Sequence, residues 1–212
     1  MKRELLQRRF VETASRILAE EGLAAVTTRR IGKEMHCNSA NTYYYFRDLD
    51  ELIAYASMES FTSYLNNVSV CCADAPNALE AYRRSWKCLI ESSVSMPQIY
   101  EKLMYGKYSD DLGRIFSGYL QLFPEKRENL DKSIVTNLTD DDFSVRDKRL
   151  VIGRCVEEGW FTAGDARILS ELIMWLHKGL LQELNAERMT VEEIRLKFFE
   201  YMDRSIEAFK QK

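Results

Sequence analysis

The chain has little glycine and proline for its length of 212 residues, with nine Gly and three Pro. Average usage would give about 15 Gly and about 11 Pro in a chain of this size. Because sandwiches and barrels place such residues in the turns between many short strands, the shortage disfavours an all-β fold. Hydrophobic residues make up 46% of the chain and charged residues 30%, so we expect a sizeable buried core rather than disorder.

Cysteine and histidine are also sparse and are badly spaced for a shared structural role. The five cysteines are odd in number, show no CxxC spacing and are accompanied by only two histidines. Such a set predicts neither a disulfide framework nor a metal site, and no cofactor is expected. The chain has no run of 18 apolar residues, and its first ten residues mix charged with apolar side chains. We therefore expect no membrane partner and a location in the cytoplasm.

Neither sign of charge is in large excess, but the charge is unevenly distributed. Lys and Arg total 30 against 33 Asp and Glu, which gives a net charge of −3. Residues 1–47 carry nine basic and five acidic side chains, a net of +4, so residues 48–212 carry a net of −7. A protein that coats nucleic acid with its whole surface is therefore excluded, whereas one that touches it with its first segment is not.

Long stretches repeat apolar residues at spacings of three and four, which predicts an all-α fold. Gly22 is placed to end the first helix in the left-handed conformation. Pro97 is placed to stop a helix, and Thr190 with Glu193 has the spacing of a capping box. The expected helices cover about 3–21, 28–35, 39–46, 50–70, 76–96, 98–106, 109–122, 124–138, 144–158, 165–186 and 190–210.

The second and third expected helices are short and are joined by a turn of only some three or four residues. A helix-turn-helix has this geometry. Ile31 and Met35 share one face of the first of these short helices, and Thr42 and Phe46 share one face of the other. We expect these four side chains to pack the pair against the first long helix of the chain, which leaves the opposite face free.

That free face carries Ser39, Ala40, Asn41, Tyr44 and Tyr45. The DNA major groove, about 12 Å wide, accepts such a helix with its N-terminal residues toward the base edges. Asn41 can offer its amide to an adenine, the two small residues let the backbone approach, and the tyrosine hydroxyls can donate to phosphates. Because successive residues point about 100° apart on a helix, at least one phenol must stay exposed or meet a partner.

Basic side chains surround this face. The N-terminal amides of the preceding helix favour a phosphate, and Arg29, Arg30, Lys33 and Arg47 add positive charge nearby. Tyr43 lies three residues before Phe46, so part of its ring should support the core even where its hydroxyl reaches DNA. The residues predicted to contact DNA are Thr28, Arg29, Asn38, Ser39, Ala40, Asn41, Tyr43, Tyr44, Tyr45 and Arg47.

From its first helix to Leu52 the sequence resembles the TetR/AcrR family of bacterial transcriptional repressors. The family's pattern is a Thr pair, Ile and a small residue, a short turn, and a recognition helix that ends in Tyr, any residue, His or Tyr, and Phe, followed by Leu. The matching residues are Thr27, Thr28, Ile31, Gly32, Tyr43, Tyr45, Phe46 and Leu52. The resemblance implies a DNA-binding domain at residues 1–47 and a helical domain at 48–212 that dimerises and binds an inducer. The implied partners are a double-stranded DNA operator, a second copy of the chain and a small molecule.

The sequence departs from the family's pattern at four positions. His36 stands for the usual Gly of the turn, and Cys37 stands for the Val that follows it. Thr42 replaces a Leu or Ile, and Leu49 replaces a Lys that follows the Phe. The missing Lys removes a phosphate contact at one edge of the footprint, and Arg47 is a candidate to replace it.

The last two expected helices carry more apolar residues than one buried face requires. One stripe of the penultimate helix can pack inward while another meets a second subunit, with Gly179 allowing close approach. By resemblance, the two helices pair with their symmetry mates across a two-fold axis, with simple core packing as the alternative. The residues predicted at this interface are Leu172, Trp175, Leu176, Gly179, Leu180, Phe198, Tyr201 and Met202.

The middle of the chain offers enough aromatic and thioether surface to line an apolar pocket for an apolar or aromatic inducer. Core packing is the alternative reading for each of these side chains. The candidate lining residues are Tyr82, Trp86, Tyr100, Met104, Tyr105, Phe116, Tyr119, Met174 and His177.

No nucleophile elbow, Gly-rich phosphate loop or pair of ligands at helical spacing is present, so we expect no enzyme and no catalytic residues. The sequence therefore predicts a ligand-responsive repressor that binds a palindromic operator as a dimer. Two alternatives stay open. The chain could bind DNA without sensing a small molecule, or it could be a helical enzyme or scaffold with a vestigial helix-turn-helix.

Overall fold

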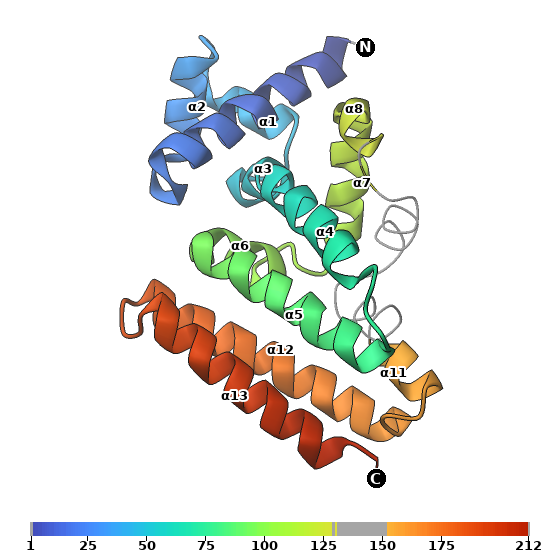
Figure 1. The fold of residues 1–212 in the computed structure, drawn as a ribbon. Helices are drawn as coiled ribbons and strands as arrows, with labels where there is room; N and C mark the ends of the chain where they lie inside the picture. The colour runs from blue at the N-terminus through green and yellow to red at the C-terminus, as the bar shows by residue number, and fades with distance from the viewer. Residues whose placement is uncertain (1, 129, 131–151, 212) are drawn as a thin grey trace. The chain divides into compact units, whose positions relative to one another are not determined.

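The computed structural model describes residues 2–128, 130 and 152–211, and the regular elements in these ranges are helices (Figure 1). The predicted all-α fold class is confirmed. By their contacts the residues form two compact units, the first being 1–63 with 102–140 and the second 64–101 with 141–212. The predicted domain boundary after Arg47 stays a prediction, because these units are groupings by contact rather than independently folding parts.

The first unit begins with a long helix whose apolar stripe is buried. Phe10, Ala14 and Ile17 of this helix, spaced three and four residues apart, are almost inaccessible to solvent. The helix ends before Gly22, whose φ of +81° is positive as expected, although its ψ of 177° is extended rather than left-handed helical. The elements here are α1 (Lys2–Glu21), the 3₁₀ helix η1 (Leu23–Ala25), α2 (Thr28–Glu34), the 3₁₀ helix η2 (Ser39–Tyr44) and α3 (Leu49–Ala56).

The prediction of a single helix at about 50–70 is wrong, because the helix is interrupted at Ser57, between α3 and α4 (Met58–Cys72). The Ser57 hydroxyl donates to the carbonyl of Ile53 over 2.8 Å, and its backbone amide donates to the same oxygen over 2.9 Å. A buried serine that bonds back to its own helix in this way bends the backbone. The helix α4 begins in the first unit and ends in the second.

Three further helices follow: α6 (Pro97–Tyr105), α7 (Leu112–Leu122) and α8 (Pro124–Arg127). Within the first unit α7 packs against α1 and α3. A Cβ atom at Gly118 would lie 2.3 Å from the Tyr55 hydroxyl, so the glycine lets α7 approach α3 closely. Of the predicted helix at 124–138, Pro124–Arg127 is helical, and the remainder lies almost entirely outside the described residues.

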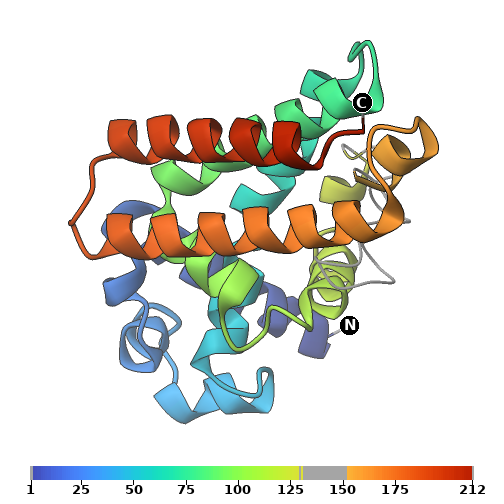
Figure 2. The ribbon, with the colours of Figure 1, turned by 90° about the horizontal axis from the view of Figure 1, so that it is seen from below.

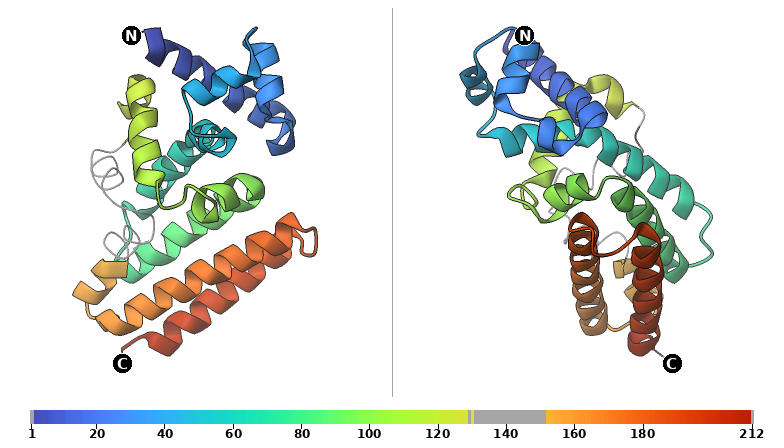
Figure 3. Two further views of the ribbon diagram at one scale, coloured as in Figure 1. Left: turned by 180° about the vertical axis from the view of Figure 1, so that it is seen from behind. Right: turned by 90° about the vertical axis from the view of Figure 1, so that its left-hand side faces the viewer.

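The second unit contains α5 (Ala78–Ser95), α11 (Gly153–Glu157), α12 (Ala163–Asn185) and α13 (Val191–Phe209). The two long helices α12 and α13 run side by side in opposite directions, as Figure 2 and the right-hand view of Figure 3 show. The helix α5 packs against α12. Thr190 and Glu193 form the predicted capping box at the start of α13. Of the predicted helix at 144–158, only the part around α11 lies within the described residues.

The described residues contain neither a membrane-spanning helix nor a cluster of metal ligands. No helix there combines the length and the apolar character needed to cross a membrane. No group of three or more His, Cys, Asp or Glu side chains there could hold a metal ion.

Candidate nucleic-acid interface

The first short helix, α2, presents its N-terminus with a cap and an exposed arginine. Thr27 is the capping residue, and its hydroxyl accepts from the backbone amide of Arg30 over 3.1 Å. Arg29 is exposed beside it, and Thr28 is half-buried. The guanidinium of Arg30 instead binds carboxylates at both of its ends, with Glu21 at 2.6 Å and Glu34 at 3.0 Å. Arg29 is therefore better placed than Arg30 to meet an external anion.

The turn between α2 and η2 depends on a glycine and on an unusual histidine. A Cβ atom at Gly32 would lie 3.0 Å from the carbonyl oxygen of Cys37 and 3.1 Å from the amide of Ser39, so only glycine lets the two segments cross this closely. His36 has a φ of +51°, in the left-handed region that glycine adopts at least cost. The family pattern has glycine at this position, which agrees with this backbone conformation.

The predicted α-helix at 39–46 is instead a 3₁₀ helix over Ser39–Tyr44. Bonds from the amide of Asn41 to the carbonyl of Asn38, and from Tyr45 to Thr42, have the i→i+3 spacing of this tighter helix. A β-branched residue followed by three tyrosines is a poor α-helix former, which explains the difference. Asn38 caps the segment, its side chain accepting from the amide of Ala40 over 2.9 Å.

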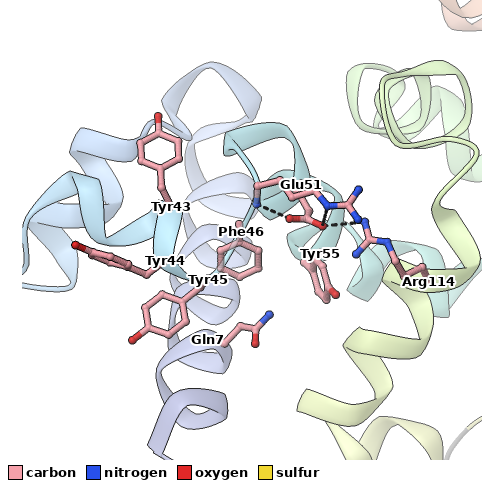
Figure 4. Close-up of a pocket in the computed structure, with 9 residues that line it drawn as sticks. Gln7, Tyr43, Tyr44, Tyr45, Phe46, Glu51, Tyr55 and Arg114 are labelled. Carbon is pink, nitrogen blue, oxygen red and sulfur yellow. Dashed lines mark hydrogen bonds and ion pairs between the residues drawn. The ribbon is translucent and has the colours of Figure 1, made fainter.

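The 3₁₀ repeat of three residues per turn determines which side chains of η2 point outward. Residues three apart share a face, and accordingly Ser39, Thr42 and Tyr45 are half-buried or buried. The Tyr45 ring packs against Phe10 with 5.3 Å between centroids. Tyr43 and Tyr44 are 58% and 73% exposed, and Figure 4 shows both phenols directed away from the core. The expectation that Tyr43 supports the core is therefore corrected, since Tyr45 does so.

The inward face of the helix pair is close to the prediction. Ile31, Thr42 and Phe46 are almost completely buried, and Met35 is half-buried with its sulfur accepting from the Thr13 hydroxyl over 3.3 Å. The Thr42 hydroxyl has no hydrogen-bond partner among the described residues. The departure from Leu or Ile at this position therefore places an unsatisfied polar atom in the core.

A shallow hollow of about 330 Å³ lies behind the recognition segment (Figure 4). Its floor holds Glu51, whose carboxylate accepts from the backbone amide of Arg47 over 2.6 Å and from the Arg114 guanidinium over 2.8 Å. Arg47 itself is exposed and binds Asp111 over 3.1 Å. A carboxylate held by these donors positions the end of the recognition segment rather than acting as a base. The lining residues are Gln7, Tyr43, Tyr44, Tyr45, Phe46, Arg47, Glu51, Tyr55 and Arg114.

Sequence reasoning missed the contribution of Glu51 and Arg114. The available signal was the Asp48–Glu51 spacing at the start of α3, where the Asp48 side chain caps the helix by accepting from the Glu51 amide. That spacing predicts a helix start but not the bond to Arg114, which lies 63 residues further along the chain.

Residues 10–56 match the model of the tetR family of bacterial regulatory proteins. This segment belongs to the TetR family. It is a helix-turn-helix DNA-binding domain of a transcription regulator, and regulators of this family are not enzymes. No curated protein matches the sequence significantly.

Two solved structures resemble the fold over nearly the whole chain. A putative transcriptional regulator from Saccharomonospora viridis in complex with choline is 17% identical, with 98% of each chain covered and a TM-score of 0.53. A TetR family transcription regulator from Marinobacter aquaeolei VT8 is 18% identical, with 100% of each chain covered and a TM-score of 0.49. The first likeness shows that the two chains share a fold.

The residues predicted at the TetR-like dimer interface divide into two sets. Leu172, Trp175, Gly179 and Tyr201 are exposed, and Trp175 is 72% accessible to solvent. In contrast, Leu180, Phe198 and Met202 are buried inside the second unit, and Leu176 is half-buried. The buried residues point along a different face of their helices from the exposed stripe, so they contribute to the unit's own core. Ile168 and Leu196 were missed and are exposed apolar residues of α12 and α13.

The predicted ligand residues fall in both units. Phe116, Tyr119, Met104 and Tyr105 belong to the first, where the Tyr119 hydroxyl donates to Glu59 over 3.0 Å. The second unit contains Tyr82, Trp86, Tyr100, Met174 and His177.

Trp86 lies at the centre of a buried aromatic cluster in the second unit. Its ring centroid is 6.4 Å from that of Tyr82, 5.9 Å from His177 and 5.6 Å from Phe198. The imidazole of His177 is 3.0 Å from the Ser93 hydroxyl, and burial lowers the pKa of His177 to about 3, so the ring is neutral at physiological pH. The indole N–H of Trp86 is buried, and no residue that the structure describes accepts a hydrogen bond from it.

Proposed function

We propose that the chain acts in the cytoplasm as a dimeric, ligand-responsive transcriptional repressor. Two recognition segments, one from each chain, enter successive major grooves of a palindromic operator, and a small molecule bound elsewhere in the chain releases the DNA. The observation that carries this proposal is the outward face of η2, where Tyr43 and Tyr44 are exposed beside a capped helix N-terminus and the exposed side chain of Arg29.

The base-reading role belongs to the start of η2. Ala40 is small and exposed, so the backbone can approach the groove, and the half-buried Asn41 follows it. An asparagine amide can both donate to and accept from an adenine edge. The tyrosine hydroxyls and Arg29 contact phosphates, which position the protein without reading sequence.

Two substitutions test these roles with DNA from either side of the protein's own gene. Alanine at Asn41 should cost about 1 to 3 kcal/mol of binding free energy at one base position, whereas alanine at Arg29 should weaken binding to all sequences and reduce its salt dependence. The measurement is fluorescence anisotropy over a series of salt concentrations. The matched control is Asn67→Ala, because Asn67 is an exposed amide on α4. Unchanged affinity and preference in Asn41→Ala would remove Asn41 from the readout.

The proposed dimer contact is the exposed apolar stripe of α12. Ile168, Leu172, Trp175 and Gly179 recur at the spacing of one helix face, and an exposed tryptophan is rare away from interfaces. A Cβ atom at Gly179 would meet no atom of the described part of the chain within 4 Å. The glycine is therefore not required by packing within the chain, whereas close approach of a second copy gives it a purpose.

The proposed inducer site is the aromatic cluster around Trp86. A buried indole N–H without an acceptor costs free energy, which a ligand with a hydrogen-bond acceptor would recover. The surrounding rings supply apolar surface, and a neutral His177 does not repel a cation. Because one protein of similar fold was solved with choline, a quaternary ammonium that aromatic rings can bind, choline is the first probe.

Titration of the intact protein with choline and related ammonium or aromatic compounds tests this site by tryptophan fluorescence and calorimetry. A ligand that binds there should lose affinity in Trp86→Phe and keep it in Trp175→Phe, since Trp175 lies on the exposed stripe. It should also weaken operator binding, because a ligand shifts an equilibrium only through its different affinities for the two states. Equal affinity in both variants would place the ligand elsewhere.

A further inference from the structure

Two cysteines from consecutive helices meet in the second unit. Cys71 lies near the end of α4 and Cys88 near the middle of α5. The thiol of Cys72 donates to the carbonyl of Ala81 over 3.4 Å, and the thiol of Cys88 donates to the carbonyl of Asn67 over 4.0 Å. A later residue of α5 thus meets an earlier residue of α4, so the two helices run alongside each other in opposite directions.

The direction of helical side chains makes the two thiols lean toward each other. Side chains on a helix lean toward its N-terminus. The thiol of Cys71 therefore leans toward the level of Asn67, and that of Cys88 leans toward the level of Arg84, whose guanidinium binds the Cys71 carbonyl over 3.2 Å. In α4 the Asn67 carbonyl is the helical partner of the Cys71 amide, so the Cys88 thiol, 4.0 Å from that carbonyl, lies beside the backbone of Cys71.

The two thiols differ in accessibility. Cys71 is exposed to solvent, whereas Cys88 is half-buried. Burial, together with the contact with Cys71, raises the pKa of Cys88 to about 12, so this thiol keeps its proton at neutral pH. A reagent in solution therefore reaches the Cys71 thiol first, and the Cys88 thiol is the second sulfur to react.

We propose that Cys71 and Cys88 form an oxidisable dithiol that a peroxide closes into a disulfide between α4 and α5. The Cys71 sulfur first attacks a peroxide oxygen, so that an S–O bond forms and the O–O bond breaks; with hydrogen peroxide, the departing hydroxide takes the Cys71 proton and leaves as water. The Cys88 sulfur then attacks the sulfenic sulfur of Cys71, an S–S bond forms, and the departing hydroxyl takes the Cys88 proton as a second water. Two thiols lose two electrons in all, and the peroxide is reduced.

Mass spectrometry of the full-length protein tests the proposal. The protein is treated with hydrogen peroxide, alkylated, and then digested without reductant. Two of the five thiols should be lost, and the peptide that begins at Cys88 after cleavage at Lys87 should be joined to the peptide that contains Cys71. A thiol reductant should restore both. Cys37, Cys72 and Cys155 should remain alkylatable once the protein is denatured, because the proposed bond uses only Cys71 and Cys88.

Single serine variants assign the bond. The cross-linked peptide should be absent from Cys71→Ser and Cys88→Ser and present in Cys72→Ser, the matched control beside Cys71. Thermal melts of the reduced proteins check that all three variants fold, and the wild-type experiment depends on none of them. Retention of all five thiols, a cross-link through Cys72, oxidation of Cys71 without a cross-link, or cross-links only between chains would each overturn the proposal.

Discussion

Among single residues, His177 gives folding a defined pH dependence. Burial lowers its pKa to about 3 in the folded chain, against about 6.5 for an unfolded histidine. Between these values the unfolded state binds a proton that the folded state does not, so stability falls as the pH drops from about 6.5 toward 3 and is fully present above that window. Between pH 7 and pH 5 this contribution is worth about 2 kcal/mol.

Urea unfolding at both pH values measures the effect. His177→Gln should lose less stability than the wild type over this interval by about that amount. Equal pH dependence in the wild type and His177→Gln would contradict the assignment.

Thr42 is a second residue whose effect can be measured, because its unsatisfied buried hydroxyl lowers the free energy of unfolding. Thr42→Val keeps the shape of the side chain and removes a buried polar atom that has no partner. The free energy of unfolding should therefore rise by about 1 kcal/mol. Thr62→Val is the control, because the buried Thr62 hydroxyl donates to the Glu59 carbonyl over 2.8 Å and its loss should bring no gain. A fall in stability in Thr42→Val would show that the hydroxyl is satisfied in solution.

Residue roles that follow from local helical spacing could be predicted from the sequence. Roles that depend on contacts between residues distant in the sequence could not. The spacing of Thr42 and Phe46 placed both in the core correctly. The inward position of Tyr45 instead of Tyr43 required knowing that η2 has three residues per turn rather than 3.6. The bond between Glu51 and Arg114 joins distant parts of the chain and leaves no local signal.

At the scale of elements, the crossing of α2 and η2 depends on Gly32. Gly32→Ala would press a methyl group against the backbone of Cys37 and Ser39, and these atoms cannot rotate away as a side chain can. The substitution should lower the free energy of unfolding by about 1 to 3 kcal/mol and weaken DNA binding through displacement of η2. Chemical denaturation and anisotropy measure the two effects. Gly164→Ala is the control, since its Cβ would meet only ordinary contact, and an equally tolerant Gly32→Ala would refute the tight crossing.

Helix positions were largely predictable because stripes, caps and prolines are local signals. The capping box of Thr190 and Glu193 fixed the start of α13, and Pro97 separated α5 from α6. The break at Ser57 was not predictable, because apolar periodicity continues through it and only the bond of its hydroxyl to Ile53 distinguishes it.

For the whole molecule, the proposed dimer makes a prediction about Gly179. Gly179 is exposed and a Cβ atom there has no described neighbour within 4 Å, so we expect the folded monomer of Gly179→Leu to keep its thermal stability. The same side chain should obstruct a second copy and shift the protein to monomer, with loss of operator affinity. Light scattering after size-exclusion chromatography gives the mass. The control Gly164→Leu, on the same helix, should stay dimeric, and a dimeric Gly179→Leu would move the interface elsewhere.

The distribution of charge could be predicted from the sequence alone, since residues 1–47 carry +4 and the remainder −7. The exposed stripe of α12 was only partly predictable, because apolar composition does not tell which residues face the chain's own core. Leu180 and Trp175 lie on one helix, yet the first is buried and the second exposed.

The most direct test is to select binding sites from a random DNA library with the purified full-length protein. The selection shows whether the protein reads DNA as a two-fold dimer. At a fixed salt concentration we expect enrichment of an inverted repeat whose half-sites lie about one helical turn (~34 Å) or a multiple of it apart. Enrichment of no sequence, or of a single asymmetric site, would contradict a two-fold reader built on the η2 segment.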